Sequence, residues 1–226
     1  MRATRLAALT VVLLVMAMSL ATGPASAGDF SPKLKFGLSN TKVKANPEMT
    51  VHVEQEEGEE ELAHVTLRIP KGFKIPGDEA VEDGDVLGTG EIVIESGPGC
   101  HPSGGGAPTA PSPPLPAELF EQDRSDEEAD RGVYAVWVLD ISGVTKITLL
   151  VTGSRASGFT LDGDIPANAF TCPPFSFDLT INQKSDGGVT ILKNPKVAGK
   201  KKFSATFFSQ DSPAKITLVQ PITIKS

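Results

Sequence analysis

Apolar and polar residues alternate with a period of two through much of the chain. The alternation is clearest at 175–181 and 203–207, where phenylalanine, leucine, isoleucine and alanine are separated by serine, threonine and aspartate. Successive side chains of a β-strand point to opposite faces, so this pattern predicts strands with one face on a core. Further strands are predicted at 33–38, 49–54, 62–69, 86–95, 133–141, 146–151, 189–192 and 214–223.

Helical periodicity is almost absent from the sequence. Alanine, glutamate and leucine gather only at 116–129, where the composition allows a helix of at most about two turns. The segment 133–141 is apolar on both faces, which predicts a central strand. Pro221 places the last strand at an edge or a bend, because proline has no N–H group for a ladder hydrogen bond.

Glycine and proline concentrate at 97–116, and acidic residues follow at 121–130. A stretch of this composition cannot bury a core, so 97–131 is predicted to be a long loop insertion. We expect an all-β fold with a single domain over 28–226, and within that class an immunoglobulin-like β-sandwich that carries this insertion. Two small β-domains joined by 97–131 are the alternative layout.

The segment 1–27 has the three parts of a secretory signal peptide. Arg2 and Arg5 precede an uncharged apolar run at 6–20, and 25–27 reads Ala-Ser-Ala, which matches a signal-peptidase site. The run is shorter than the about 20 residues that span a bilayer. We therefore expect cleavage before Gly28 and a secreted, extracellular protein without a membrane span.

The chain carries 28 acidic and 21 basic residues, a net charge of −7, and cleavage of the signal peptide would make it more acidic. This balance disfavours nucleic acid as a partner, because nucleic-acid binding depends on the neutralisation of phosphates. The basic cluster of Lys193, Lys196 and residues 200–202 is the exception. It is either a charged turn before a strand or a contact for an anionic polymer such as a cell-wall glycan.

Cys100 and Cys172 are the two cysteines of the chain. In an exported protein, an even pair of cysteines predicts a disulfide. Closing a loop of this length stabilises the folded state by about 4 kcal/mol in the chain-entropy description.

His52 and His64 are the candidate metal ligands. If 49–54 and 62–69 formed a hairpin centred on Gly58, the two histidines would face each other with Cβ atoms about 5 Å apart. Two imidazoles at that distance can share a Zn²⁺ or Cu²⁺ ion, with Glu54 as the nearest third ligand. In a sandwich the two strands can instead belong to different sheets, which would leave both rings as surface side chains.

The sequence contains no catalytic, phosphate-binding or dinucleotide motif, and its acidic stretches lack the full spacing of a calcium loop. We therefore expect no cofactor and no enzymatic activity. The expected function is that of a binding or structural module at or outside the cell envelope, for an unknown ligand. The alternatives are an extracellular metal-binding protein that uses His52 and His64, and a hydrolase whose site forms only in three dimensions.

Overall fold

A computed structural model describes residues 30–56, 59–94, 113–142, 145–166 and 175–226. It confirms the all-β class, because within these residues eleven strands form one antiparallel sheet. The helical segments of the described residues are η1 (Asp78–Ala80) and α2 (Asp126–Asp130). The strands are β1 (Lys33–Leu38), β2 (Met49–Gln55), β3 (Leu62–Ile69), β4 (Val86–Ile94), β5 (Leu115–Gln122), β6 (Val133–Ile141), β7 (Thr145–Ser154), β8 (Gly158–Asp164), β9 (Phe175–Ile181), β10 (Gly199–Ser209) and β11 (Lys215–Ile224).

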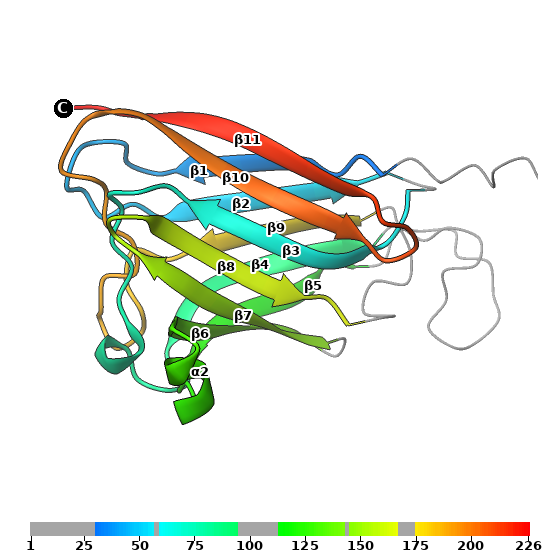
Figure 1. Ribbon diagram of the computed structural model, residues 1–226, viewed down its shortest axis with the longest axis horizontal. Helices are drawn as coiled ribbons and strands as arrows, with labels where there is room; N and C mark the ends of the chain where they lie inside the picture. Colours follow the sequence, from blue (N-terminus) through cyan, green and yellow to red (C-terminus); the bar gives the residue numbers. More distant parts are fainter. Residues whose placement is uncertain (1–29, 57–58, 95–112, 143–144, 167–174) are drawn as a thin grey trace, which may run out of the picture.

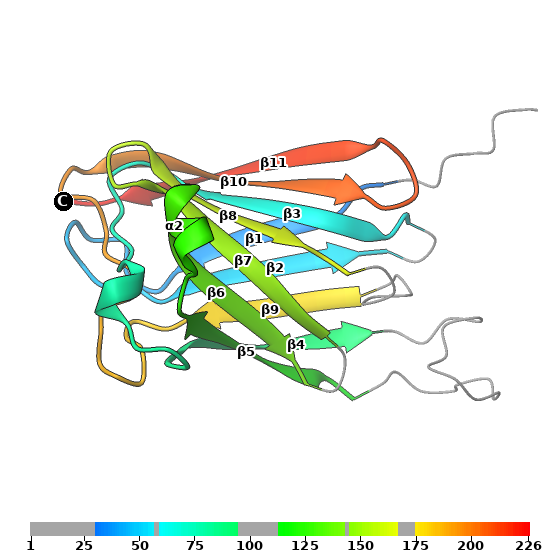
Figure 2. The same cartoon turned by 60° about the horizontal axis from the view of Figure 1, so that its bottom comes forward.

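The sheet curls into a nearly closed, barrel-like shape. Its strand order is β1-β2-β9-β4-β5-β6-β7-β8-β3-β10-β11, and the two outermost strands, β1 and β11, lie beside each other (Figures 1 and 2). The immunoglobulin-like sandwich expected from the sequence is not confirmed, because the strands follow one another in one continuous sheet. The prediction that Pro221 lies in an edge strand is confirmed by the position of β11.

Gln220 of β11 joins the two edges of the sheet. Its side-chain amide donates a hydrogen bond to the carbonyl oxygen of Phe36 in β1 and accepts one from the N–H of Phe36, each at 2.7 Å. Since every strand pair is antiparallel and the number of strands is odd, β1 and β11 run parallel. The glutamine amide therefore takes the place of a backbone peptide group at the seam.

We expect Gln220→Met to lower the free energy of unfolding by about 2–3 kcal/mol, because the apolar side chain fills the same space but leaves the Phe36 N–H and C=O without partners. Urea denaturation measures the change. Gln183→Met, at an exposed glutamine in the β9–β10 connection, is the matched control and should change the midpoint little. Equal midpoints for both variants would show that the seam does not depend on this amide.

The inward-facing side chains fill the interior of the curled sheet. Trp137, Phe159, Phe203 and Phe207 are almost completely buried. An apolar cavity of about 70 Å³ remains among aliphatic and phenylalanine side chains such as Val65. This volume is well below the about 150 Å³ that admits a benzene-sized molecule, so the interior is a packed core.

The central position predicted for 133–141 agrees with the structure. Strand β6 lies between β5 and β7, and Val136 and Val138 on its outer face are as deeply buried as Trp137 on its inner face. Helix α2 packs against this strand. Its N-terminus is closed by a capping box, in which Ser125 and Glu128 each bond the backbone N–H of the other.

The prediction of a loop over 97–131 is wrong in part, because Leu115–Gln122 is strand β5 in the middle of the sheet. The short helix expected within 116–129 forms only at the end of that segment, as α2 (Asp126–Asp130), because its first part belongs to β5. Ala117 and Leu119 point into the core, so the alternation of the strand overrides the helical preference of alanine, leucine and glutamate.

The prediction of a strand at 189–192 is also wrong. This segment belongs to the β9–β10 connection, where only the isolated bridges Lys184–Thr190 and Lys74–Lys193 form. Its apolar residues Ile191 and Leu192 are buried, but they pack against the end of the core and not within a strand. In the described residues, neither helical segment has the length and apolar character of a membrane-crossing helix.

Candidate functional site

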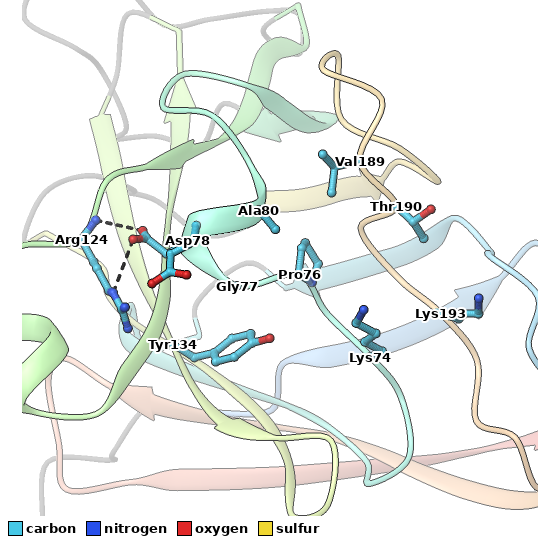
Figure 3. Close-up of a pocket in the computed structure, with 11 residues that line it drawn as sticks. Lys74, Pro76, Gly77, Asp78, Ala80, Arg124, Tyr134, Val189, Thr190 and Lys193 are labelled. Atoms are coloured by element: carbon cyan, nitrogen blue, oxygen red, sulfur yellow. Dashed lines mark hydrogen bonds and ion pairs between the residues drawn. The ribbon is translucent and has the colours of Figure 1, made fainter.

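A cleft of about 750 Å³ opens at the end of the barrel-like sheet where the C-terminus lies. We call it the cleft. It lies between the β3–η1 connection, η1, the start of β6 and the β9–β10 connection (Figure 3). Its lining residues are Lys74, Pro76, Gly77, Asp78, Glu79, Ala80, Arg124, Tyr134, Val189, Thr190 and Lys193.

An ion pair between Asp78 and Arg124 forms one wall of the cleft. The Asp78 carboxylate accepts from the backbone N–H of Arg124 at 3.0 Å, and its other oxygen lies 3.4 Å from Arg124 Nε. The guanidinium also donates to the carbonyl oxygen of Val133 at 2.8 Å. These bonds hold η1 against the β5–β6 connection, so the wall is fixed before any ligand arrives.

Lys74 and Lys193 form the opposite wall (Figure 3). Their backbones make a two-way antiparallel bridge, with N–H to oxygen distances of 3.0 Å and 2.9 Å. Both side chains are exposed, and neither makes an ion pair with a carboxylate of the described residues. The two ammonium groups are therefore available to an anion.

Tyr134 lies between the two walls (Figure 3). The register of the β6–β7 pair shifts between Val133 and Ala135, so the regular pairing is interrupted at Tyr134. The ring packs against Phe159 with centroids 5.3 Å apart, and the hydroxyl donates to the carbonyl oxygen of Ile75 at 3.2 Å. The cleft thus combines a fixed aromatic ring with separated charges.

Glu121 of β5 lies behind the cleft. The residue is 1% exposed, and neither carboxyl oxygen has a hydrogen-bond partner. Burial, together with the nearby charges of Asp78, Asp123 and Asp83, raises the pKa of this carboxyl to about 8. The indole N–H of Trp137 lies close enough to oppose the shift, but it makes no well-formed hydrogen bond with the carboxyl. Glu121 is therefore mostly protonated at neutral pH.

The side chains that line the cleft carry a net positive charge. Of its two lining carboxylates, Asp78 is neutralised by Arg124, which leaves Glu79 against the two lysines. This contrasts with the net charge of −7 of the whole chain. A local positive field attracts an anion to the cleft, whereas the acidic remainder of the surface repels anions.

His52 and His64 do not face each other, because the hairpin that would pair β2 with β3 does not form. β2 pairs with β1 and β9, whereas β3 pairs with β8 and β10. His52 Nδ1 lies 2.8 Å from Asp178, opposite it in the β2–β9 pair. Among the described residues, no group of three or more histidine, cysteine, aspartate or glutamate side chains is arranged to hold a metal ion.

His64 lies on the outer face of the sheet between two aspartates. Its Nδ1 is 2.6 Å from Asp164 and its Nε2 is 2.9 Å from Asp162. Partial burial lowers the pKa of this imidazole, but the hydrogen bonds and charges of the two aspartates outweigh it, so the pKa is raised. This arrangement favours an imidazolium over a neutral metal ligand.

Cys100 and Cys172 both lie outside the described residues, so the disulfide stays a prediction. The basic cluster predicted from Lys193, Lys196 and 200–202 falls at the same end of the sheet as the cleft. Lys193 is the member of that cluster that lines the cleft.

Sequence reasoning missed Lys74 and Arg124, and it considered Asp78 only as part of an acidic stretch. It favoured burial of Tyr134 in the apolar strand 133–141 over a sugar-stacking platform. The two lysines of the bridge are separated by more than half of the chain, and no local pattern joins them. The one available signal was the proline- and glycine-containing segment 70–77, which marks a loop directly after a predicted strand.

No model of a known protein family matches the chain, and a comparison with curated proteins gives no match. The function is therefore argued from the geometry of the cleft.

Proposed function

We propose that this chain is an exported, non-enzymatic binding protein that holds a small anionic ligand, of the size of a sugar acid, in the cleft. The observation that carries the proposal is the pair of bridged lysines, Lys74 and Lys193, which face Tyr134 across a volume of about 750 Å³. The volume lies in the range of small-molecule sites. The export signal at 1–27 supports a role outside the cell.

The chemistry of the lining favours binding over catalysis. Ammonium, guanidinium and phenol groups donate hydrogen bonds that bind and orient a carboxylate or phosphate. Glu121 has a pKa near neutrality, as a general acid or base requires. However, it is 1% exposed and does not line the cleft, so it has no route to a bound ligand.

The proposal predicts that galacturonate, used as a probe, binds in the cleft and that binding weakens as salt is added. We expect Lys74→Met combined with Lys193→Met to lower the affinity at least about tenfold, since each charged hydrogen bond contributes about 1.5–3 kcal/mol. Titration followed by NMR measures the affinity and reports whether signals of Tyr134 shift.

Lys215→Met is the matched control, because Lys215 is exposed at the start of β11, at the other end of the sheet. It should leave the affinity within about twofold. Equal loss in the control and in the double variant, or a titration without response at Tyr134, would contradict the assignment of the cleft.

A further inference from the structure

A second depression lies at the same end of the sheet, and we call it the hollow. It has a volume of about 380 Å³, and four of its lining residues are cations while none is acidic. The lining residues are Lys71, Gly72, Arg155, Ala156, Pro195, Lys196, Val197 and Lys201. In the part of the chain that the structure describes, none of the four cations makes an ion pair.

Three separate segments build the hollow, and backbone contacts fix them. The N–H of Gly72 donates to the carbonyl oxygen of Arg155 at 2.8 Å, and Arg155 Nε lies 3.3 Å from the carbonyl oxygen of Gly72. Gly72 has φ of 98°, and a Cβ atom there would lie 3.1 Å from Pro195. Only glycine accommodates both the conformation and this close approach.

Asn194 anchors the segment that carries Lys193 and Lys196. Its buried side-chain amide donates to the carbonyl oxygens of Asn40 and Lys42, each at 2.8 Å. The backbone on either side of the hollow is therefore held by hydrogen bonds, and its cations project from a rigid base.

The hollow and the cleft share the same two segments. Residues 71–74 lie against 193–196, with the Lys74–Lys193 bridge at the cleft and the Gly72–Pro195 contact at the hollow. Three residues of chain span no more than about 11 Å, so the two depressions are direct neighbours. Besides Arg124, which is paired with Asp78, the two depressions are lined by six cations, Lys71, Lys74, Arg155, Lys193, Lys196 and Lys201.

We infer that the cleft and the hollow form one continuous site for a linear acidic polysaccharide, whose carboxylates meet the cations of both depressions. This inference rests on the proposed function, because one sugar acid of the polysaccharide would occupy the cleft. The sugars that follow it would extend over the hollow.

An acidic glycan fits better than a nucleic acid. Proteins that bind single-stranded nucleic acid present successive aromatic side chains to successive bases. Among the described lining residues of both depressions, Tyr134 is the only aromatic one.

The experiment compares galacturonate with oligogalacturonates of increasing length on the full mature chain. We expect the affinity to rise at least about tenfold from the monomer to an oligomer that covers both depressions. Arg155→Glu combined with Lys196→Glu should abolish that gain and leave the affinity for the monomer within about twofold. Lys215→Glu reverses one charge at the other end of the sheet, half the charge change of the double variant, and should keep most of the gain.

The outcomes separate the inference from the proposed function. Binding of the monomer without any gain for longer oligomers overturns the continuous site and leaves the cleft intact. A gain that survives Arg155→Glu and Lys196→Glu also overturns it. Tighter binding of single-stranded DNA than of the oligogalacturonate overturns the choice of a glycan, and no binding of the monomer overturns the proposed function itself.

Discussion

Glu121→Gln should stabilise the protein by about 4 kcal/mol at pH 8 and by less than about 1 kcal/mol at pH 5. The reason is that the carboxyl of Glu121 is buried without a hydrogen-bond partner, and its pKa is raised from 4.5 to about 8 by burial and by neighbouring aspartates. Glutamine has the same size and stays neutral, so it removes the cost of ionisation at high pH.

The sign of the pH dependence follows from the two pKa values. In the unfolded chain, Glu121 ionises near 4.5, while in the folded chain it keeps its proton until about pH 8. Unfolding therefore releases a proton between these values, and the stability of the unmodified protein falls as the pH rises through this range. Below 4.5 both states are protonated and the effect vanishes.

Urea denaturation at several pH values between 5 and 8 measures the difference. Glu118→Gln is the matched control, because Glu118 is exposed on the outer face of the same strand. It removes one negative charge without removing a buried carboxyl, so its effect should be small and nearly independent of pH. A constant difference between Glu121→Gln and the unmodified protein over this range would refute the raised pKa.

Reduction of the predicted Cys100–Cys172 disulfide should lower the free energy of unfolding by about 4 kcal/mol. Both cysteines lie outside the described residues, but the strands that lead to them are neighbours. Ile94 at the end of β4 pairs with Phe175 at the start of β9. Cys100 follows Ile94 by six residues and Cys172 precedes Phe175 by three, so the chain is long enough for the two sulfurs to meet.

Intact-mass measurement after alkylation tests the bond directly. Without reductant no cysteine should be labelled, and with reductant both should be. Cys100→Ser combined with Cys172→Ser should show the same loss of stability as reduction, and reductant should not affect that variant further. Labelling of both thiols in the non-reduced protein would disprove the disulfide.

Much of the strand content was predictable because each strand has one inward face. Where apolar residues alternate cleanly, as at 175–181 and 203–207, the structure has a strand. The prediction failed where local composition and tertiary pairing disagree. In β5, alanine, leucine and glutamate favour a helix, but pairing with β4 and β6 on both sides stabilises the extended chain.

The candidate site was far less predictable than the strands. The predicted histidine pair depended on a hairpin between neighbouring segments, whereas the sheet inserts other strands between them. The bridged lysines come from loops after β3 and after β9, and their proximity is set by the curvature of the sheet. A strand pattern specifies which side chains face inward, but not which strand lies next to which.

The sequence by itself determined that this is an all-β chain with alternating inward and outward residues, a central apolar strand and an edge strand at Pro221. Those properties depend on the two-residue period of a strand and on the missing N–H group of proline, which are local. Only the tertiary structure decided that the strands form one curled sheet, that Gln220 joins its edges, and that cations from distant loops gather at one end. Pairing partners are chosen by the packing of a shared core, which no short segment contains.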